Sequence, residues 1–266
     1  MAPPEQAPTV VLTRPAGQAV AERAALEAAG FQVVERPAIV IEHCADRAEL
    51  LALLDRLDAF DLIHFASINA VEALLRAVPE WAARVPAVST CIAVMGAGTR
   101  AALERGWPAA TSNLLDGGTA AAIDSETLHR HLLATGLPLD RALLVKGEGG
   151  RSWLGDRLAE DGTRVEPVTV YRRLAPVLSQ TAADDFVGQL AQPAWLVVSS
   201  IEAAVNLAGL MDSIGARLAD WRRWPVFASH ARVAATLASL GCERVTTIEP
   251  GVANLVQTLK SQLLRS

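Results

Sequence analysis

The segment Ser67-Ile-Asn-Ala-Val-Glu-Ala-Leu74 is matched later in the chain by Ser200-Ile-Glu-Ala-Ala-Val-Asn-Leu207, at an offset of 133 residues (200 minus 67). Val10 to Gly17 matches Leu143 to Gly150 at the same offset, and Gly96 falls on Ser229. This offset is half of the 266-residue chain. Three blocks that share one offset predict that a single strand-and-helix unit is present twice, and we expect the ligand in the cleft between the copies. The alternative is that any two strand-and-helix units look alike.

Short runs of β-branched residues alternate with Ala- and Leu-rich stretches around these blocks. Val10 to Thr13 predicts a strand, Ala19 to Ala29 a helix that ends at Gly30, and Phe31 to Glu35 the next strand. This alternation is typical of parallel sheets with crossover helices, so the sequence predicts an α/β fold. Further strands are predicted at Asp61 to Ala66, Cys91 to Met95, Ala142 to Lys146, Arg164 to Tyr171, Trp195 to Ser199, Pro225 to Ala228 and Arg244 to Ile248.

Composition narrows the class of protein. Hydrophobic residues make up 51% of the chain, yet no uninterrupted apolar run reaches the roughly 18 residues that span a bilayer. The first residues lack a basic start followed by an apolar stretch, so we expect no signal peptide and a cytoplasmic protein that does not enter membranes. Cys44, Cys91 and Cys242 lie too far apart for a zinc motif or a disulfide framework, and we expect all three to be small buried residues.

The net charge of -5 argues against binding to duplex nucleic acid. An anionic ligand must therefore be held by local positive charge. Lysine occurs only at Lys146 and Lys260, so arginine supplies 22 of the 24 basic residues. Arginine suits planar, bidentate binding of carboxylates, although the base composition of a GC-rich genome explains the same bias.

Gly96-Ala-Gly98-Thr-Arg-Ala101 fits the GxGxxA form of a dinucleotide-binding turn. That fingerprint belongs after the first strand of a fold, with an acidic residue about 20 positions later at the end of the next strand. Asp116 has this spacing but lies in a predicted loop, and the matching turn at Ser229 contains no glycine. A nucleotide-dependent oxidoreductase is therefore kept as an alternative.

Small polar residues stand where predicted strands lead into helices. At such turns, free backbone N–H groups and the helix dipole favour anions, although Ser, Thr and Asn also cap helices in every kind of protein. The glycine-rich turn Lys146-Gly-Glu-Gly-Gly-Arg151 adds two cations, and Arg14 holds the equivalent place after the first strand. The residues concerned are Ser67, Asn69, Gly96, Thr99, Ser199, Ser200, Ser229 and Arg232.

No catalytic triad or metal motif is evident. His129 and His131, two positions apart on a predicted helix, point to different sides of it, and the other histidines share no ligand spacing. No GxSxG sequence is present. The sequence predicts no metal site, and an enzyme with this sequence must work without a strongly activated nucleophile.

Eight segments, in this order and spacing, resemble the uroporphyrinogen-III synthase family over essentially the whole chain. The most specific is Val145-Lys-Gly-Glu-Gly-Gly-Arg-Ser-Trp-Leu154, which is followed by Gly162 and by Val170-Tyr-Arg-Arg173. The full set is Leu12 to Pro15, Leu26 to Gly30, Phe65 to Val71, Gly96 to Leu103, Asp124 to Glu126, Leu144 to Arg151, Val165 to Arg173 and the turn at Ser199.

The resemblance implies two Rossmann-like, flavodoxin-like parallel-sheet domains joined by a two-stranded β ladder. Residues 1–38 and 175–266 would form a discontinuous first domain and residues 44–168 the second, with linker strands at 38–43 and 168–174. The tandem repeat by itself allows another division, into two consecutive halves that meet near Asp124 to Gly136.

The resemblance also implies an activity, that of a cofactor-independent hydro-lyase of haem biosynthesis. Such an enzyme cyclises hydroxymethylbilane, a linear tetrapyrrole, to uroporphyrinogen III with inversion of ring D and loss of water. Loss of the hydroxyl gives an azafulvene cation, and a spiro intermediate then fragments and recloses. A transient handover from hydroxymethylbilane synthase and a monomeric state are expected.

Roles for individual residues follow from the same resemblance. Tyr171 is the expected proton donor to the leaving hydroxyl, and a half-buried packing role is its alternative. Arg14, Lys146, Arg151 and the polar residues at the helix entries are expected to bind the eight carboxylates of the substrate. Ser229 to Arg232 departs from the Gly-x-x-Thr turn of many members and offers Arg232 in its place. A non-catalytic, bilobed small-anion-binding module shares all of these features and is the main alternative.

Overall fold

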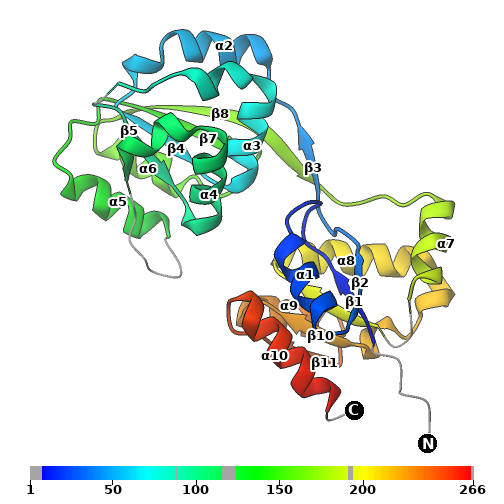
Figure 1. Cartoon of the computed structure of the whole chain (residues 1–266). Helices are drawn as coiled ribbons and strands as arrows, with labels where there is room; N and C mark the ends of the chain where they lie inside the picture. The colour runs from blue at the N-terminus through cyan, green and yellow to red at the C-terminus, as the bar shows by residue number, and fades with distance from the viewer. Residues whose placement is uncertain (1–7, 88, 116–123, 191–193, 265–266) are drawn as a thin grey trace, which may run out of the picture. The chain divides into compact units, whose positions relative to one another are not determined.

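The computed structural model describes residues 8–87, 89–115, 124–190 and 194–264. By its internal contacts the chain divides into two compact units (Figure 1). The first unit comprises Met1–Val40 and Leu174–Ser266, and the second unit comprises Ile41–Arg173. Each unit contains one of the two sheets.

The first unit contains a five-stranded parallel sheet in the order β11-β10-β9-β1-β2. Helices α1 and α10 pack on one face, where Leu26, Leu255 and Leu259 cover Val10 and Leu12 of the sheet. Its strands are β1 (Thr9–Leu12), β2 (Gln32–Glu35), β9 (Trp195–Val198), β10 (Pro225–Ala228) and β11 (Arg244–Thr247), and its helices are α1 (Val20–Ala28), α7 (Gln180–Gly188), α8 (Ile201–Ile214), α9 (Ala231–Ser239) and α10 (Val252–Leu263).

The second unit contains a six-stranded sheet in the order β3-β8-β7-β4-β5-β6. The strands from β8 to β6 pair in parallel. Its strands are β3 (Val40–His43), β4 (Leu62–Phe65), β5 (Cys91–Val94), β6 (Leu114–Leu115), β7 (Arg141–Gly147) and β8 (Arg164–Leu174), and its helices are α2 (Arg47–Asp55), α3 (Ile68–Ala77), α4 (Gly96–Gly106), α5 (Ser125–Ala134) and α6 (Trp153–Glu160).

The repeat is visible in the order of the strands. In the first unit, β2-β1-β9-β10-β11 has the flavodoxin order 2-1-3-4-5. The series β8-β7-β4-β5-β6 repeats this order in the second unit, but there the chain enters at the middle strand β4. Each unit consequently combines strands from both halves of the repeat, because β1 pairs with β9 and β4 pairs with β7.

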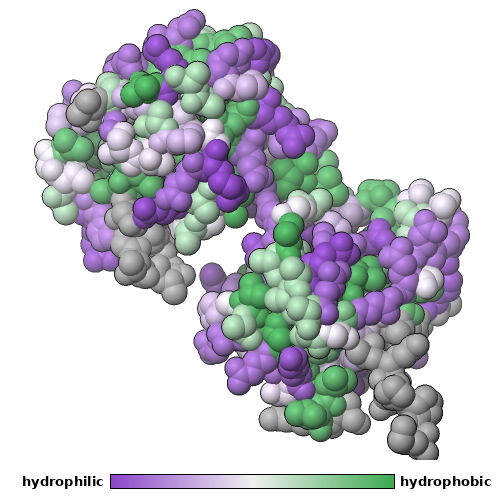
Figure 2. Space-filling view, in the orientation of Figure 1, coloured by the Kyte–Doolittle hydropathy of each residue, from purple (hydrophilic) through white to green (hydrophobic). Residues whose placement is uncertain are grey.

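Two separate cores fill the faces of the second sheet. Along β4, Ile63 and Phe65 point into a core with the side chains of α2, α3 and α4, whereas Leu62 points to the opposite face, where α5 and α6 pack. This alternation is the period-two pattern of a strand buried on both sides. Figure 2 shows hydrophilic residues over much of the visible face of each unit, with smaller hydrophobic areas among them.

The predicted α/β fold is confirmed, and the predicted strands agree with the observed ones to within three residues. The extended segment before His43 forms β3, which lies beside β8 at the edge of the second sheet, as the predicted ladder requires. The short strand β6 was not predicted. The prediction for Cys44 is wrong, since this thiol is exposed while Cys91 and Cys242 are buried. Among the described residues, no helix combines the length and apolar character needed to cross a membrane.

Candidate functional site

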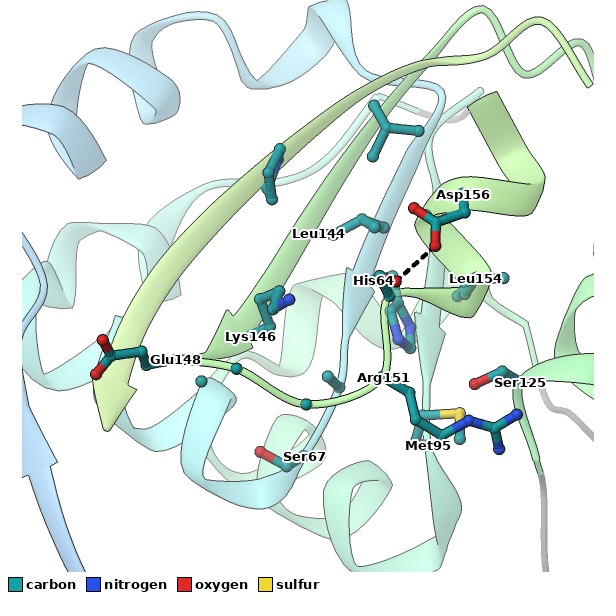
Figure 3. A pocket seen from close by; sticks show the side chains of 18 of the residues that line it. His64, Ser67, Met95, Ser125, Leu144, Lys146, Glu148, Arg151, Leu154 and Asp156 are labelled. Carbon is teal, nitrogen blue, oxygen red and sulfur yellow. Dashed lines mark hydrogen bonds between the residues drawn. The ribbon is translucent and has the colours of Figure 1, made fainter. Parts of the chain in front are cut away.

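A pocket of about 600 Å³ opens in the second unit at the carboxyl ends of β4 and β7. These neighbouring strands form the point at which the order of the flavodoxin-like sheet reverses, and ligands of open α/β sheets bind at such points. Figure 3 shows the pocket walls, formed by the end of β4, the glycine-rich loop after β7 and the start of α6. The polar lining residues that matter below are His64, Ser67, Lys146, Arg151, Asp156 and Tyr171.

A register shift in the sheet brings Tyr171 into this pocket. Lys146 pairs with Thr169, but the next residue, Gly147, pairs with Tyr171. A β-carbon at Gly147 would lie 2.5 Å from Cζ of the tyrosine ring, so only glycine leaves room for the ring there. Tyr171 is consequently packed against backbone and is only 4% exposed. The ring has a fixed position from which its hydroxyl can act.

The Tyr171 hydroxyl is hydrogen-bonded to Oγ of Ser67, at 3.0 Å. Ser67 also caps α3, since its Oγ accepts a hydrogen bond from the backbone N–H of Ala70 at 3.2 Å. The serine therefore has a structural role and a role at the pocket at the same time. When its hydroxyl donates to the phenol oxygen, the phenol proton is free to point toward a ligand.

Two cations line the same pocket in different environments. The Lys146 side chain is half-buried and makes no ion pair with another described residue. Arg151, with a side chain 66% exposed, pairs with Glu126 at 2.6 Å. Asp156 is engaged by the Ser152 hydroxyl, the contact drawn as a dashed line in Figure 3. Lys146 is thus better placed than Arg151 to neutralise a carboxylate.

His64 was not singled out from the sequence, yet it lines the pocket. Burial lowers the pKa of its imidazole to about 4, against a weaker opposite effect of a hydrogen bond with the Ala93 carbonyl. The ring is therefore neutral at neutral pH. The available signal was a polar residue within an otherwise apolar strand, Leu62-Ile-His-Phe65.

The first unit has a second pocket, of about 420 Å³, at the carboxyl ends of β1, β9 and β10. Arg14, Ser199 and Ser229 line it, as predicted residues, together with His230 and Glu249. The Arg14 guanidinium is held by Glu22 at 2.7 Å, and the Ser229 hydroxyl donates to the carbonyl of Ser199 at 2.9 Å. The Arg14 guanidinium and the Ser229 hydroxyl are therefore already engaged within the protein.

The structure does not bring the other predicted residues into either pocket. Ser200 caps α8 by accepting from Ala203 N–H at 3.0 Å, so the capping alternative accounts for it. Thr99 is 2% exposed and donates to the carbonyl of Met95 at 2.7 Å. Asn69, Gly96 and Arg232, at the first turns of α3, α4 and α9, are not among the residues that line either pocket.

The glycines of the GxGxxA turn have structural reasons. Gly96 has a φ of 80°, which favours glycine, and a β-carbon at Gly98 would lie 2.8 Å from Cδ1 of Ile68 on the adjacent α3. The turn and the close helix packing explain both residues without a nucleotide. Asp116, the acidic residue with the fingerprint spacing, lies outside the described residues.

The fold and the two pockets define a class: a protein with a duplicated flavodoxin-like sheet and a ligand pocket at the carboxyl edge of each copy. The model of the family "Uroporphyrinogen-III synthase HemD" matches residues 20–257. The chain therefore belongs to the uroporphyrinogen-III synthase family. It is a cyclising lyase that acts in tetrapyrrole biosynthesis and converts hydroxymethylbilane to uroporphyrinogen III.

Solved structures of similar fold include proteins from Thermus thermophilus and Helicobacter pylori. A mutant uroporphyrinogen III synthase of Thermus thermophilus has a TM-score of 0.56 at 19% identity, with 98% of this chain and 100% of that chain covered. Uroporphyrinogen-III synthetase of Helicobacter pylori has a TM-score of 0.58 at 13% identity, with 96% and 99% covered. At these identities the similarity establishes the fold, and the family match carries the function.

Proposed function

We propose that the pocket of the second unit holds the reacting end of hydroxymethylbilane and that Tyr171 is the catalytic proton donor. The observation that supports this most directly is the placement of the Tyr171 hydroxyl, which extends from a buried ring to Ser67 in a pocket shared with Lys146. The tyrosine is the only one in the chain, so no other phenol can replace it.

Proton transfer from Tyr171 to the substrate hydroxyl lets the carbon–oxygen bond break and water leave. The product of this step is an azafulvene cation, and the phenolate left behind is stabilised by a hydrogen bond from Ser67 and by the nearby Lys146 cation. Attack by a substituted pyrrole carbon then gives a spiro intermediate, which fragments and recloses with ring D inverted. The proton lost on ring closure returns to the phenolate, so the enzyme ends in its initial state.

The residues that we propose to bind the substrate carboxylates differ in how directly the structure supports them. In the second unit Lys146 is the first, because its ammonium is not already paired with a described residue, and Arg151 is the second. In the first unit we propose Arg14, Ser199 and Ser229, which line a common pocket. Less directly supported candidates, which act through backbone N–H groups or rearranged side chains, are Asn69, Gly96, Thr99, Ser200 and Arg232.

Orientation of the substrate is the main contribution that this site has to make. The bilane cyclises spontaneously to the wrong isomer, so the enzyme must hold the reacting carbons in one arrangement rather than supply a strong nucleophile. A buried tyrosine fixed against Gly147 is a suitable rigid element. We further propose that the enzyme is a cytoplasmic monomer that receives its substrate by transient handover, with its first unit as a discontinuous domain and its second as a continuous one.

Turnover of Tyr171→Phe tests the proposal. The variant keeps the buried ring and loses only the hydroxyl, and we expect kcat to fall by a factor of about 100 or more, the usual contribution of a general acid. Chromatographic separation of the type I and type III products after oxidation measures both rate and isomer ratio. An unchanged rate of type III formation would remove Tyr171 from the mechanism.

A further inference from the structure

His64 lines the pocket of the second unit, and the mechanism above gives its imidazole no role. It is the third residue of β4, and its side chain shares the sheet face of Leu62, opposite that of Ile63 and Phe65. The residue is only 6% exposed, and Figure 3 shows its ring within the pocket. A polar ring at this depth requires hydrogen-bond partners.

One partner fixes the tautomer of this imidazole. Nδ1 lies 3.2 Å from the carbonyl oxygen of Ala93, which can only accept, so Nδ1 carries the proton. The ring is neutral because burial depresses its pKa to about 4. Nε2 consequently bears a lone pair, and it makes no hydrogen bond to any residue that the structure describes.

The surroundings determine which ligand group this lone pair suits. Leu144 and Leu154 line the pocket beside His64 and offer no donor, so the hydrogen bond to Nε2 must come from water or from a ligand in the pocket. The tetrapyrrole substrate carries carboxylates, one hydroxyl and pyrrole N–H groups. Its carboxylates need donors, which Lys146 and Arg151 supply, its hydroxyl receives the proton of Tyr171 in the proposed mechanism, and its pyrrole N–H groups need an acceptor.

We propose that Nε2 of His64 accepts a hydrogen bond from a pyrrole N–H of the bound tetrapyrrole and so fixes the orientation of that ring. This inference rests on the proposed function in one respect, that the pocket binds substrate. His64 is in this sense a positioning residue, because a ring bound through its N–H is held with its nitrogen edge toward β4. Val197, the third residue of β9, lines the pocket of the first unit at the corresponding place and has no acceptor.

A pair of variants separates this role from a purely structural one. In His64→Asn, the amide nitrogen can replace Nδ1 as donor to Ala93, but nothing remains at the place of Nε2. In His64→Gln, the longer side chain can place its amide oxygen near that position. We expect kcat/KM of His64→Asn to fall about 10-fold, roughly what one buried donor left unpaired costs, with more type I isomer, and His64→Gln to be less affected.

The reverse order, with His64→Asn close to wild type and His64→Gln impaired, would show that the bond to Ala93 is what matters and would overturn the inference. Thermal unfolding of both variants checks that they fold. Because either variant can be too unstable to assay, a measurement on the wild-type enzyme is needed as well.

That measurement is the ¹⁵N NMR signal of His64 in enzyme with ring-labelled histidine, recorded with and without uroporphyrinogen III. We expect an Nε2 signal typical of an unprotonated nitrogen that moves to a lower chemical shift when the tetrapyrrole is added. A signal unmoved at saturation overturns the inference and leaves Tyr171 untouched. A wild-type rate for Tyr171→Phe would instead remove the proposed function while the NMR result for His64 still stood.

Discussion

The pockets of the two units occupy the same place on the same sheet topology but carry different chemistry. In the second unit His64, Lys146 and Tyr171 line the pocket. In the first unit, Val197 stands at the position equivalent to His64, and the cation of the pocket is Arg14. The repeat offset of 133 makes the buried Ala38 the equivalent of Tyr171. Of the two pockets, only that of the second unit therefore has a tyrosine, a histidine on its central strand and a cation unpaired among the described residues.

The charges of the two pockets differ for a physical reason. Arg14 is neutralised by Glu22 at 2.7 Å, whereas Lys146 has no such partner among the residues that the structure describes. A cation without a partner strongly favours an anion nearby, while a paired one adds little. With the proposed function, this difference predicts that the reaction takes place in the second unit and that the first unit binds carboxylates, and each experiment below tests that division.

Gly147→Ala should have the largest effect, because its β-carbon would meet three atoms of the Tyr171 ring at 2.5, 2.8 and 2.9 Å. We expect a loss of stability of about 1–3 kcal/mol from overpacking and a fall in activity of about 100-fold, since small misplacements of a catalytic group have such effects. Chemical denaturation and the isomer assay measure the two. Gly209→Ala in the first unit is the control, because no atom lies within 4 Å of its new β-carbon.

A second substitution tests the cause of that loss. In a Tyr171→Ala background the clash disappears, so the added destabilisation by Gly147→Ala should disappear as well. If the two substitutions instead destabilise the protein additively, the ring does not occupy the position described, and the division between the units loses its main support.

The sequence predicts the strands of this fold, which depend on local patterns, better than it predicts how strands that are distant in the sequence pair. The strands were predictable because each is a short apolar run bounded by turn residues, as in Cys91 to Val94. The offset of 133 showed the duplication. The pairing of β1 with β9 is a contact between residues far apart in the sequence, such as Val10 and Trp195, and both halves of a repeat offer equally suitable partners. Local pattern alone therefore left the division into units open.

The candidate site was predictable to a similar extent. Ser67, Lys146, Arg151 and Tyr171 were predicted and line one pocket. Thr99 shows why another predicted residue does not line the pocket. As the fourth residue of its helix it points back to the preceding turn, where its hydroxyl donates to the carbonyl of Met95. His64 was missed because a single histidine within an apolar strand is indistinguishable from a core residue until its neighbours are known. Which of the predicted residues contact substrate stays a prediction.

Acid should destabilise the second unit through His64, a residue with no titratable counterpart at Val197. Burial lowers the folded-state pKa to about 4 from the ordinary value of 6.5. The unfolded chain thus binds the proton first, and stability present above pH 6.5 is lost as the pH falls to about 4. The loss amounts to about 3 kcal/mol. Urea unfolding at several pH values, compared between wild type and His64→Gln, separates the contribution of His64 to the free energy of unfolding from that of the carboxylates, which also titrate.

The urea-unfolding comparison distinguishes a buried His64 ring from one that water reaches. A difference between the proteins that grows below pH 6.5 agrees with a buried, neutral imidazole. A constant difference would mean that water reaches the ring readily and that its pKa is near that of a free histidine. Amide hydrogen exchange of Ile63 and Phe65 reports whether the opening is local to β4.

Lys146→Gln and Arg14→Gln compare the cations of the two pockets directly. We expect KM of Lys146→Gln to rise by about 10-fold, the loss of one charge-assisted hydrogen bond to a carboxylate. Arg14→Gln should raise KM by only about 3-fold, because Glu22 already engages that guanidinium. Initial rates over a range of bilane concentrations give both values. Equal effects would mean that both units bind carboxylates with similar strength.

Ser67→Ala and Ser200→Ala form the finest comparison, since both serines cap the helix after the corresponding strand. Their Oγ atoms accept from the backbone N–H groups of Ala70 and Ala203 at 3.2 and 3.0 Å, so each alanine variant should lose about 1 kcal/mol of stability. Only Ser67 also bonds to Tyr171, at 3.0 Å. We therefore expect activity to fall several-fold in Ser67→Ala alone, with the denaturation midpoints of the two variants alike. Equal activities would mean that Ser67 acts only through the helix cap, and that its hydrogen bond to the Tyr171 hydroxyl does not contribute to catalysis.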